Sequence, residues 1–212
     1  MKTKIVSLII LIEVIFLKIG FAQEEPIKNS CCIIGIKVLP EKSTINDFTS
    51  NTANNVLSCG IQLISGNNES NFSLETGVYY YQKAASVEVY NGTGISAVKN
   101  ISAIYYENLG LPFLLRYHYK VVYTSLGAQV DFLLNRTKKN QEYFYTETNQ
   151  LKDNTLNLGI GFNVGIQIKM NEKINFFTEA RLLQTLTPAY SDKRLGYKFL
   201  NYGLGLGVNY KI

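Results

Sequence analysis

The last stretch of the chain, residues 200–212, constrains the fold more than any other part of the sequence. Its apolar residues occupy every second position, and glycine, asparagine and lysine fill the positions between them (LNYGLGLGVNYKI). Successive side chains of a β-strand point to opposite faces, so this pattern predicts a strand with one apolar face and one small or polar face. Soluble proteins avoid such an exposed apolar edge. The stretch therefore favours the closing strand of a membrane β-barrel.

Similar alternation recurs from Cys31 onward and is clearest in residues 155–169, where seven apolar side chains alternate with glycine and polar residues. The segments are longer than most strands of soluble proteins and suit tilted spans of a bilayer. We expect eight strands, at residues 31–39, 56–64, 72–83, 102–119, 121–134, 155–169, 174–187 and 197–212.

The connections between these segments alternate in length. Residues 40–55, 84–101, 135–154 and 188–196 form the longer ones, whereas residues 65–71, the turn near Lys120 and residues 170–173 are short. If both termini are periplasmic, every short connection is periplasmic and every long one extracellular, as in outer-membrane barrels. The sequence thus predicts an all-β fold, an eight-stranded antiparallel up-and-down transmembrane β-barrel of the small OmpA/OmpX type.

The N-terminus predicts a secretory signal peptide. Lys2 and Lys4 precede an apolar run over residues 5–19, which Glu13 interrupts, and small residues precede a polar stretch after Ala22. The alternative, a transmembrane anchor, is disfavoured because the run is short and carries charges. We expect cleavage after Ala22, which leaves residues 23–212 as one barrel domain in the outer membrane of a Gram-negative envelope.

Composition agrees with a membrane barrel and excludes some partners. Only 17% of the residues are charged, and a net charge of +5, part of it in the N-terminal segment, is too weak to indicate nucleic-acid binding. Aromatic residues cluster near the predicted strand ends, as in the girdles of membrane barrels. The expected periplasmic girdle holds Phe72, Tyr117, Tyr119, Phe176 and Tyr210, and the expected outer girdle holds Tyr80, Tyr105, Phe132 and Tyr202.

The three cysteines leave two interpretations open. Cys59 bonded to Cys31 or Cys32 is compatible with an oxidising compartment, whereas three apolar wall residues are the simpler interpretation. Their spacing and the lack of a nearby histidine disfavour a zinc site. We expect no metal and no cofactor.

Four segments resemble the PorT-like outer-membrane β-barrel family of Bacteroidetes-type bacteria. They are NLGLPFLLRY at residues 108–117, SLGAQVDFLL at 125–134, FFTEARLLQTLT at 176–187 and the terminal LGLGVNYKI. The resemblance implies an eight-stranded outer-membrane barrel, and members mostly lack a defined activity. One branch of the family is tied to a secretion system, which is not carried over to this chain. The partners that we expect are outer-membrane lipid, the barrel-assembly machinery, and extracellular or secretion-system proteins that meet the loops.

Two positions depart from that family's pattern. Gly110 stands where an acidic residue often precedes the apolar-Pro pair, and the last residue is Ile212 instead of phenylalanine. Tyr210 keeps an aromatic side chain close to the end. Tyr210 and Ile212 together are the expected assembly signal.

Strand alternation assigns a set of charged residues to the lumen. Because unpaired charge away from water is costly, mixed charges there are expected to pair and to plug the barrel. A polar path or a ligand pocket is the sharper alternative, and the inward glycines of the sixth and eighth strands leave room for neighbours such as Tyr79, Tyr81 or Arg181. The assigned residues are Glu75, Lys83, Arg116, His118, Asp131, Lys169, Glu179 and Arg181.

These features favour a structural or surface-interaction role and no enzymatic activity. Lipid A modification would need a catalytic histidine near the outer leaflet, but the single histidine, His118, falls near a periplasmic turn, and no nucleophile elbow or triad is present. A narrow channel or a secretion-associated barrel for small solutes or partner proteins is the first alternative. A soluble lipocalin-like barrel is the second, although its outward positions would carry lysine and glutamate rather than glycine and asparagine.

Overall fold

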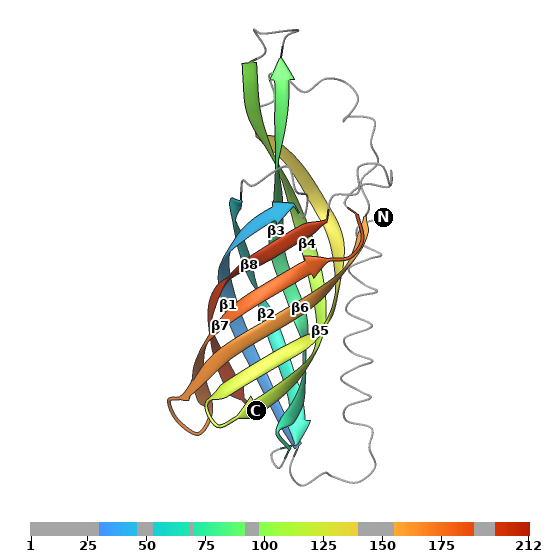
Figure 1. Cartoon of the computed structure of the whole chain (residues 1–212). Helices are drawn as coiled ribbons and strands as arrows, with labels where there is room; N and C mark the ends of the chain where they lie inside the picture. The colour runs from blue at the N-terminus through green and yellow to red at the C-terminus, as the bar shows by residue number, and fades with distance from the viewer. Residues whose placement is uncertain (1–29, 46–52, 68–69, 92–97, 140–154, 189–197) are drawn as a thin grey trace.

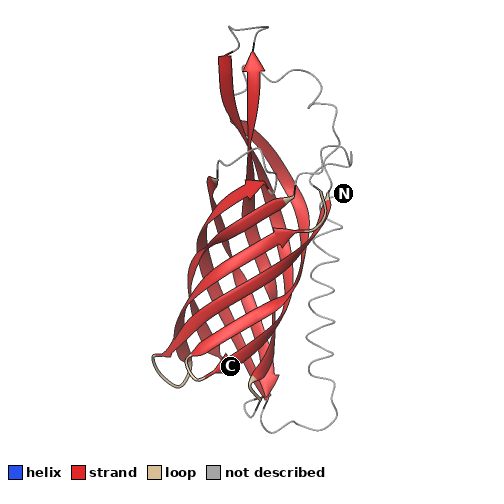
Figure 2. Ribbon diagram, in the orientation of Figure 1, coloured by secondary structure: helices blue, strands red, loops and turns tan. Residues whose placement is uncertain are grey.

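The computed structural model describes residues 30–45, 53–67, 70–91, 98–139, 155–188 and 198–212. Eight strands run antiparallel in chain order, and the last pairs with the first to close a barrel (Figures 1 and 2). The predicted fold is confirmed, whereas the segment predicted to be a signal peptide lies outside the described residues. No helix in the described part is long and apolar enough to cross a membrane. The strands are β1 (Ser30–Ile45), β2 (Asn54–Asn67), β3 (Phe72–Asn91), β4 (Val98–Tyr119), β5 (Val122–Lys139), β6 (Leu156–Lys169), β7 (Ile174–Thr185) and β8 (Phe199–Lys211).

Strand β8 closes the barrel against β1, as its alternation predicts. Ile36 lies opposite Val208, and Val38 lies opposite Leu206, so that apolar residues meet on the outer face. The glycines and Asn209 between them point inward. The strand is therefore no exposed edge, because every barrel strand has two neighbours.

Several strands run further than predicted, which corrects the expected loop boundaries. Residues 40–45 continue β1, residues 84–91 continue β3, β4 already begins at Val98, and residues 135–139 continue β5. Pro40 had suggested the end of the first strand. It is exposed on the outer face, and the pairing of β1 with β8 is interrupted at Leu39 and Pro40, so the missing proline N–H removes no ladder bond there.

Strands β3 and β4 extend past the rest of the barrel as a two-stranded hairpin (Figure 1). Their pairing continues to Asn91 opposite Val98. In contrast, β2 pairs with β3 only as far as Tyr81, and β5 pairs with β4 only from Ala103 onward. The hairpin stands at the end of the barrel opposite the tight turns.

The other end of the barrel carries the tight turns and the end of β8 (Figure 1). Lys120 turns the chain between β4 and β5 with a left-handed φ of 56°. Between β6 and β7, Asn171 Oδ1 accepts the backbone N–H groups of Lys173 and Ile174 at 2.9 and 2.8 Å. Short turns of outer-membrane barrels are periplasmic, so we refer to this end as the periplasmic end.

The wall has an apolar outside and a polar inside. In β6 burial alternates residue by residue, and outward side chains such as Phe162 are exposed while Asn163 beside it is buried. This order is the reverse of a soluble protein and fits contact with lipid. The aromatic residues expected at the periplasmic girdle are all exposed; at the outer girdle Tyr202 is exposed and Tyr80, Tyr105 and Phe132 are half-buried.

Strand register excludes a disulfide between Cys59 and the vicinal cysteines. Cys59 lies opposite Val38, whereas Cys32 lies opposite Ser65 near the start of β1. At the usual rise per residue their Cα atoms are roughly 20 Å apart, far beyond the reach of a disulfide. Cys31, opposite Gly66, is still further away.

Candidate functional site in the barrel interior

The lumen is filled by charged side chains of both signs. They project inward from five strands, β1, β3, β4, β5 and β7, and each is at most 6% exposed. Among the described residues the buried cations are Lys37, Lys83, Arg116 and Arg181, and the buried anions are Glu41, Glu75, Asp131 and Glu179.

The cluster nearer the periplasm joins four of these strands. Lys37 Nζ lies 3.1 Å from Glu75 Oε1 and 2.7 Å from Glu179 Oε1. Arg116 donates from Nε and Nη2 to Glu75 Oε2 at 3.0 and 2.6 Å. Two cations and two anions thus form one continuous neutral group across the lumen.

Aromatic rings enclose this cluster. Tyr123 donates its hydroxyl to Glu179 Oε2 at 2.9 Å, and its ring centroid lies 4.0 Å from Arg116 Cζ. Lys37 Nζ lies 4.8 Å from the ring centroid of Tyr79. Such cation–π contacts help to offset the lost hydration of both cations.

A second neutral cluster lies nearer the outer end. Lys83 Nζ is 3.1 Å from Asp131 Oδ2, and Gln129 donates to Asp131 Oδ1 at 2.8 Å. Arg181 donates to Gln129 Oε1 at 2.8 Å, and its Nε lies 3.8 Å from Glu41 Oε1. Gln129 therefore links the two ion pairs of this cluster.

The buried charges of the lumen are paired, cation with anion. A buried charge costs several kcal/mol unless a partner of opposite sign and hydrogen bonds compensate it, and here every cation contacts an anion. Neutral polar side chains also pair inside the barrel: Gln62 donates to Asn209 Oδ1 at 2.6 Å, and the Ser43 hydroxyl donates to Asn201 Oδ1 at 2.8 Å. Among the described residues, the four buried cations and the four buried anions of the lumen therefore balance one another.

The structure brings together six of the eight residues that the sequence assigns to the lumen. His118 is half-buried, with Nε2 3.1 Å from Ser73 Oγ, and Lys169 is exposed. Both occupy inward-facing positions of their strands, but they lie at the periplasmic opening of the barrel, outside the two ionic clusters. The six in the ionic clusters are Glu75, Lys83, Arg116, Asp131, Glu179 and Arg181.

Sequence reasoning missed two members of the network, Lys37 and Glu41. Lys37 stands between Ile36 and Val38, which are 62% and 49% exposed, so the alternation of β1 contains the signal that it points inward. Glu41 follows Pro40, where the first strand had been expected to end. Ser58 of β2 donates a hydrogen bond to it.

The inward glycines receive bulky neighbours, but other ones than predicted. On β6 the ring of Tyr123 covers Gly165, and on β8 the ring of Phe177 covers Gly207. Tyr79 and Tyr81 instead contact Gly60 and Gly110. The glycines of β6 and β8 do make room for bulky side chains, as predicted. The side chains that a methyl group at Gly165 and Gly207 would meet first are, however, Tyr123 and Phe177 of the adjacent strands, and not the predicted Tyr79, Tyr81 or Arg181.

We expect Gly165→Ala to lower the free energy of unfolding by about 1–3 kcal/mol, the usual cost of overpacking. Its methyl group would overlap the ring of Tyr123, which the Glu179 hydrogen bond holds in place. Urea unfolding in lipid vesicles measures the change. Gly161→Ala is the matched control, since its methyl group would meet Leu114 Cδ2 at 3.6 Å, an ordinary contact. Equal effects of the two substitutions would contradict the proposed fit.

The described residues contain no group of three or more His, Cys, Asp or Glu side chains arranged to hold a metal ion. His118 lies at the periplasmic end, where its ring also lies near Tyr123, with centroids 6.0 Å apart.

A family model supports the assignment made from this geometry. The model of the outer membrane protein beta-barrel domain matches residues 36–191, most of the chain. The chain belongs to this family. The predicted location in the outer membrane is thereby confirmed, and the apolar outer wall lies in lipid.

Solved structures that match the chain include outer-membrane proteins of low sequence identity. Neisserial surface protein A is 11% identical with a TM-score of 0.49, over 85% of this chain and 97% of that one. AlkL is 14% identical with a TM-score of 0.43, over 87% and 90%. Ail of Yersinia pestis, solved with the heparin analogue sucrose octasulfate, is 10% identical with a TM-score of 0.40, over 87% and 99%. No curated protein sequence matches the chain.

Proposed function

We propose that the protein is a small outer-membrane barrel with a structural or surface-interaction role, plugged by its own side chains. The observation that carries this proposal is the buried network, in which four cations contact four anions. Pairing across five strands stabilises the closed sheet and fills the lumen at the same time. A barrel of eight strands has an interior just wide enough for such a filling.

The interaction surface in this proposal is the outer end of the barrel. The β3–β4 hairpin extends there beyond the other strands, and its backbone pairing reaches Asn91 and Val98 (Figure 1). A projecting hairpin is accessible to a partner outside the cell. Extracellular or secretion-system partners would meet this hairpin and the loops around it.

Membership in the PorT-like branch and an assembly signal at the C-terminus complete the proposal. The four segments that resemble PorT-like proteins occur in the expected order along the chain, which supports membership in that branch. Tyr210 is 43% exposed on the outer face, and the Ile212 N–H donates to the Cys32 carbonyl at 3.0 Å, which holds the chain end against β1. An ordered, outward-facing end is what the barrel-assembly machinery would recognise.

Planar-bilayer recording tests the plugged interior. We expect the purified wild-type protein to show no resolvable conductance steps, because the clusters leave no open path. The double variant Glu75→Ala, Arg116→Ala removes a pair of large buried side chains without leaving a net charge, and we expect it to conduct. The double variant Leu204→Ala, Leu206→Ala on the lipid-facing wall is the control and should stay silent. Steady conductance by the wild type would favour the narrow channel instead.

A further inference from the structure

At the outer end of the barrel, β3 parts from β2 but stays paired with β4. The backbone pairing of β3 with β2 ends at Tyr81, opposite Ser58, whereas its pairing with β4 continues to Asn91. In the described part of the chain, residues 82–91 therefore have a neighbouring strand on one side only. We call the other side of this segment, which runs along the projecting hairpin of Figure 1, the β3 edge.

Two polar side chains replace the backbone ladder at the base of the β3 edge. Asn201 Nδ2 donates to the Gln82 carbonyl at 2.9 Å, and the Ala84 N–H donates to Ser43 Oγ at 2.9 Å. In an antiparallel ladder, the N–H and C=O of one residue point to the same side, and the side alternates from residue to residue. Since Gln82 and Ala84 point to the β3 edge, Glu88 and Tyr90 direct their backbone groups there as well.

Beyond its base the β3 edge is open. Glu88 lies opposite Ile101 and Tyr90 lies opposite Lys99 across the hairpin. These are pairs whose N–H and C=O groups point away from each other, so β4 does not use them. Among the described residues, no backbone group bonds to the edge side of Glu88 or Tyr90. Such a strand edge is a template on which another chain can pair.

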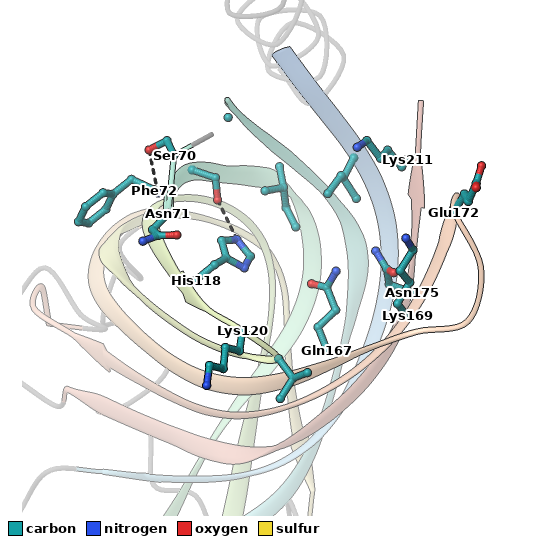
Figure 3. Close-up of a pocket in the computed structure, with 15 residues that line it drawn as sticks. Ser70, Asn71, Phe72, His118, Lys120, Gln167, Lys169, Glu172, Asn175 and Lys211 are labelled. Atoms are coloured by element: carbon teal, nitrogen blue, oxygen red, sulfur yellow. Dashed lines mark hydrogen bonds between the residues drawn. The ribbon is translucent and has the colours of Figure 1, made fainter. Parts of the chain in front are cut away.

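The strand ends at the opposite, periplasmic end are tied together by backbone bonds. Around the opening that Figure 3 shows, the His118 N–H donates to the Asn71 carbonyl at 2.7 Å. The Gln167 N–H donates to the Val121 carbonyl, also at 2.7 Å. The long unpaired segment of β3 thus lies at the end of the barrel that faces away from the periplasm.

We propose that the β3 edge binds an extended segment of an extracellular protein by β-strand addition. This inference rests on the proposed use of the outer end as an interaction surface, and it adds the mode of recognition. Backbone hydrogen bonds supply the affinity in this mode, and here the N–H and C=O groups of Glu88 and Tyr90 would make them. A slender extended chain fits better than a second barrel, because β3 leans inward over the rim to Ser43 of β1 and Asn201 of β8.

Fluorescence anisotropy with the refolded barrel in detergent micelles tests this proposal. The probe is a labelled peptide of residues 98–105 (VKNISAIY), the part of β4 that already pairs with one side of β3. We expect the peptide to bind and to slow amide hydrogen exchange at Glu88 and Tyr90. Glu88→Pro removes an N–H from the β3 edge but none from the ladder with β4. It should weaken binding by about tenfold, the effect of roughly one backbone hydrogen bond.

Two matched variants separate the edge from other effects of this substitution. Ile101→Pro makes the same change directly opposite, where the N–H points to the other side of the hairpin, and should leave the affinity unchanged. Glu88→Gln removes the charge, keeps the N–H and should change the affinity little.

Three results would overturn the proposal: no binding of the peptide at millimolar concentration, equal weakening by Glu88→Pro and Ile101→Pro, or equal weakening by Glu88→Pro and Glu88→Gln. Self-association of the barrel that Glu88→Pro abolishes would overturn it too, because the occupant would then be a second copy. The planar-bilayer recording does not involve this edge. A failed peptide titration therefore leaves the plugged barrel standing, and conductance by the wild type leaves the β3 edge standing.

Discussion

Glu75→Gln is expected to lower the free energy of unfolding by about 3–5 kcal/mol, the usual cost of breaking a buried ion pair. Glu75 contacts both Lys37 and Arg116 and has no exposed surface. Loss of its charge leaves the periplasmic cluster with two cations and one anion, away from water. Urea unfolding in lipid vesicles measures the effect, and Glu172→Gln in the exposed β6–β7 turn is the control, with an expected change within about 0.5 kcal/mol.

The double variant Glu75→Gln, Arg116→Gln separates charge balance from side-chain packing. It restores neutrality, because Lys37 and Glu179 still form a pair at 2.7 Å. We therefore expect it to be more stable than Glu75→Gln alone, with a coupling energy of about 1–3 kcal/mol, as for residues in one network. Additive losses from the two substitutions would contradict a cluster held by charge balance.

Leu206→Arg is expected to destabilise the barrel by about 2–4 kcal/mol, the cost of an arginine near the middle of the bilayer. Leu206 lies near the centre of β8 and is 67% exposed on the outer face. In a soluble protein the same exposure would make the substitution nearly neutral. The measurement is again the free energy of unfolding in vesicles, together with the yield of inserted barrel.

Depth dependence is the control for this second prediction. Tyr202 faces outward on the same strand, nearer the outer end, and is 40% exposed. Tyr202→Arg should cost only about 0–1 kcal/mol, because the arginine reaches the headgroup region. If both arginines were tolerated equally, β8 would not face lipid at the depth proposed.

Alternation was enough to predict the closed barrel but not where its strands end. Within the membrane, each outward position must be apolar, so the pattern of β6 or β8 is unmistakable. Beyond the membrane that requirement ends, and strands such as β3 continue to Asn91 through backbone pairing with β4 alone. Pro40 misled for a similar reason, since its effect depends on whether the neighbouring ladder needs its N–H.

The site was predictable as a set of inward charges but not as a set of pairs. Parity identified Glu75 and Glu179, yet their shared partner Lys37 lies on β1, a strand for which the inward face had not been traced. The distance between two residues in the sequence does not show whether they pair, because Lys37 and Glu179, 142 positions apart, meet across the lumen of the closed barrel. The alternation also gives no depth along a strand, so it could not show that His118 and Lys169 lie at the periplasmic opening and not in the clusters.

Tryptophan fluorescence with brominated lipid as the quencher tests the central claim, an apolar face toward lipid and a packed interior. The chain has no tryptophan, so one introduced residue gives the whole signal. Phe176 and Phe177 are neighbours at one depth on β7, 47% and 4% exposed. We predict strong quenching of Phe176→Trp and little quenching of Phe177→Trp. Equal quenching of the two, or stronger quenching of Phe177→Trp, would contradict the account.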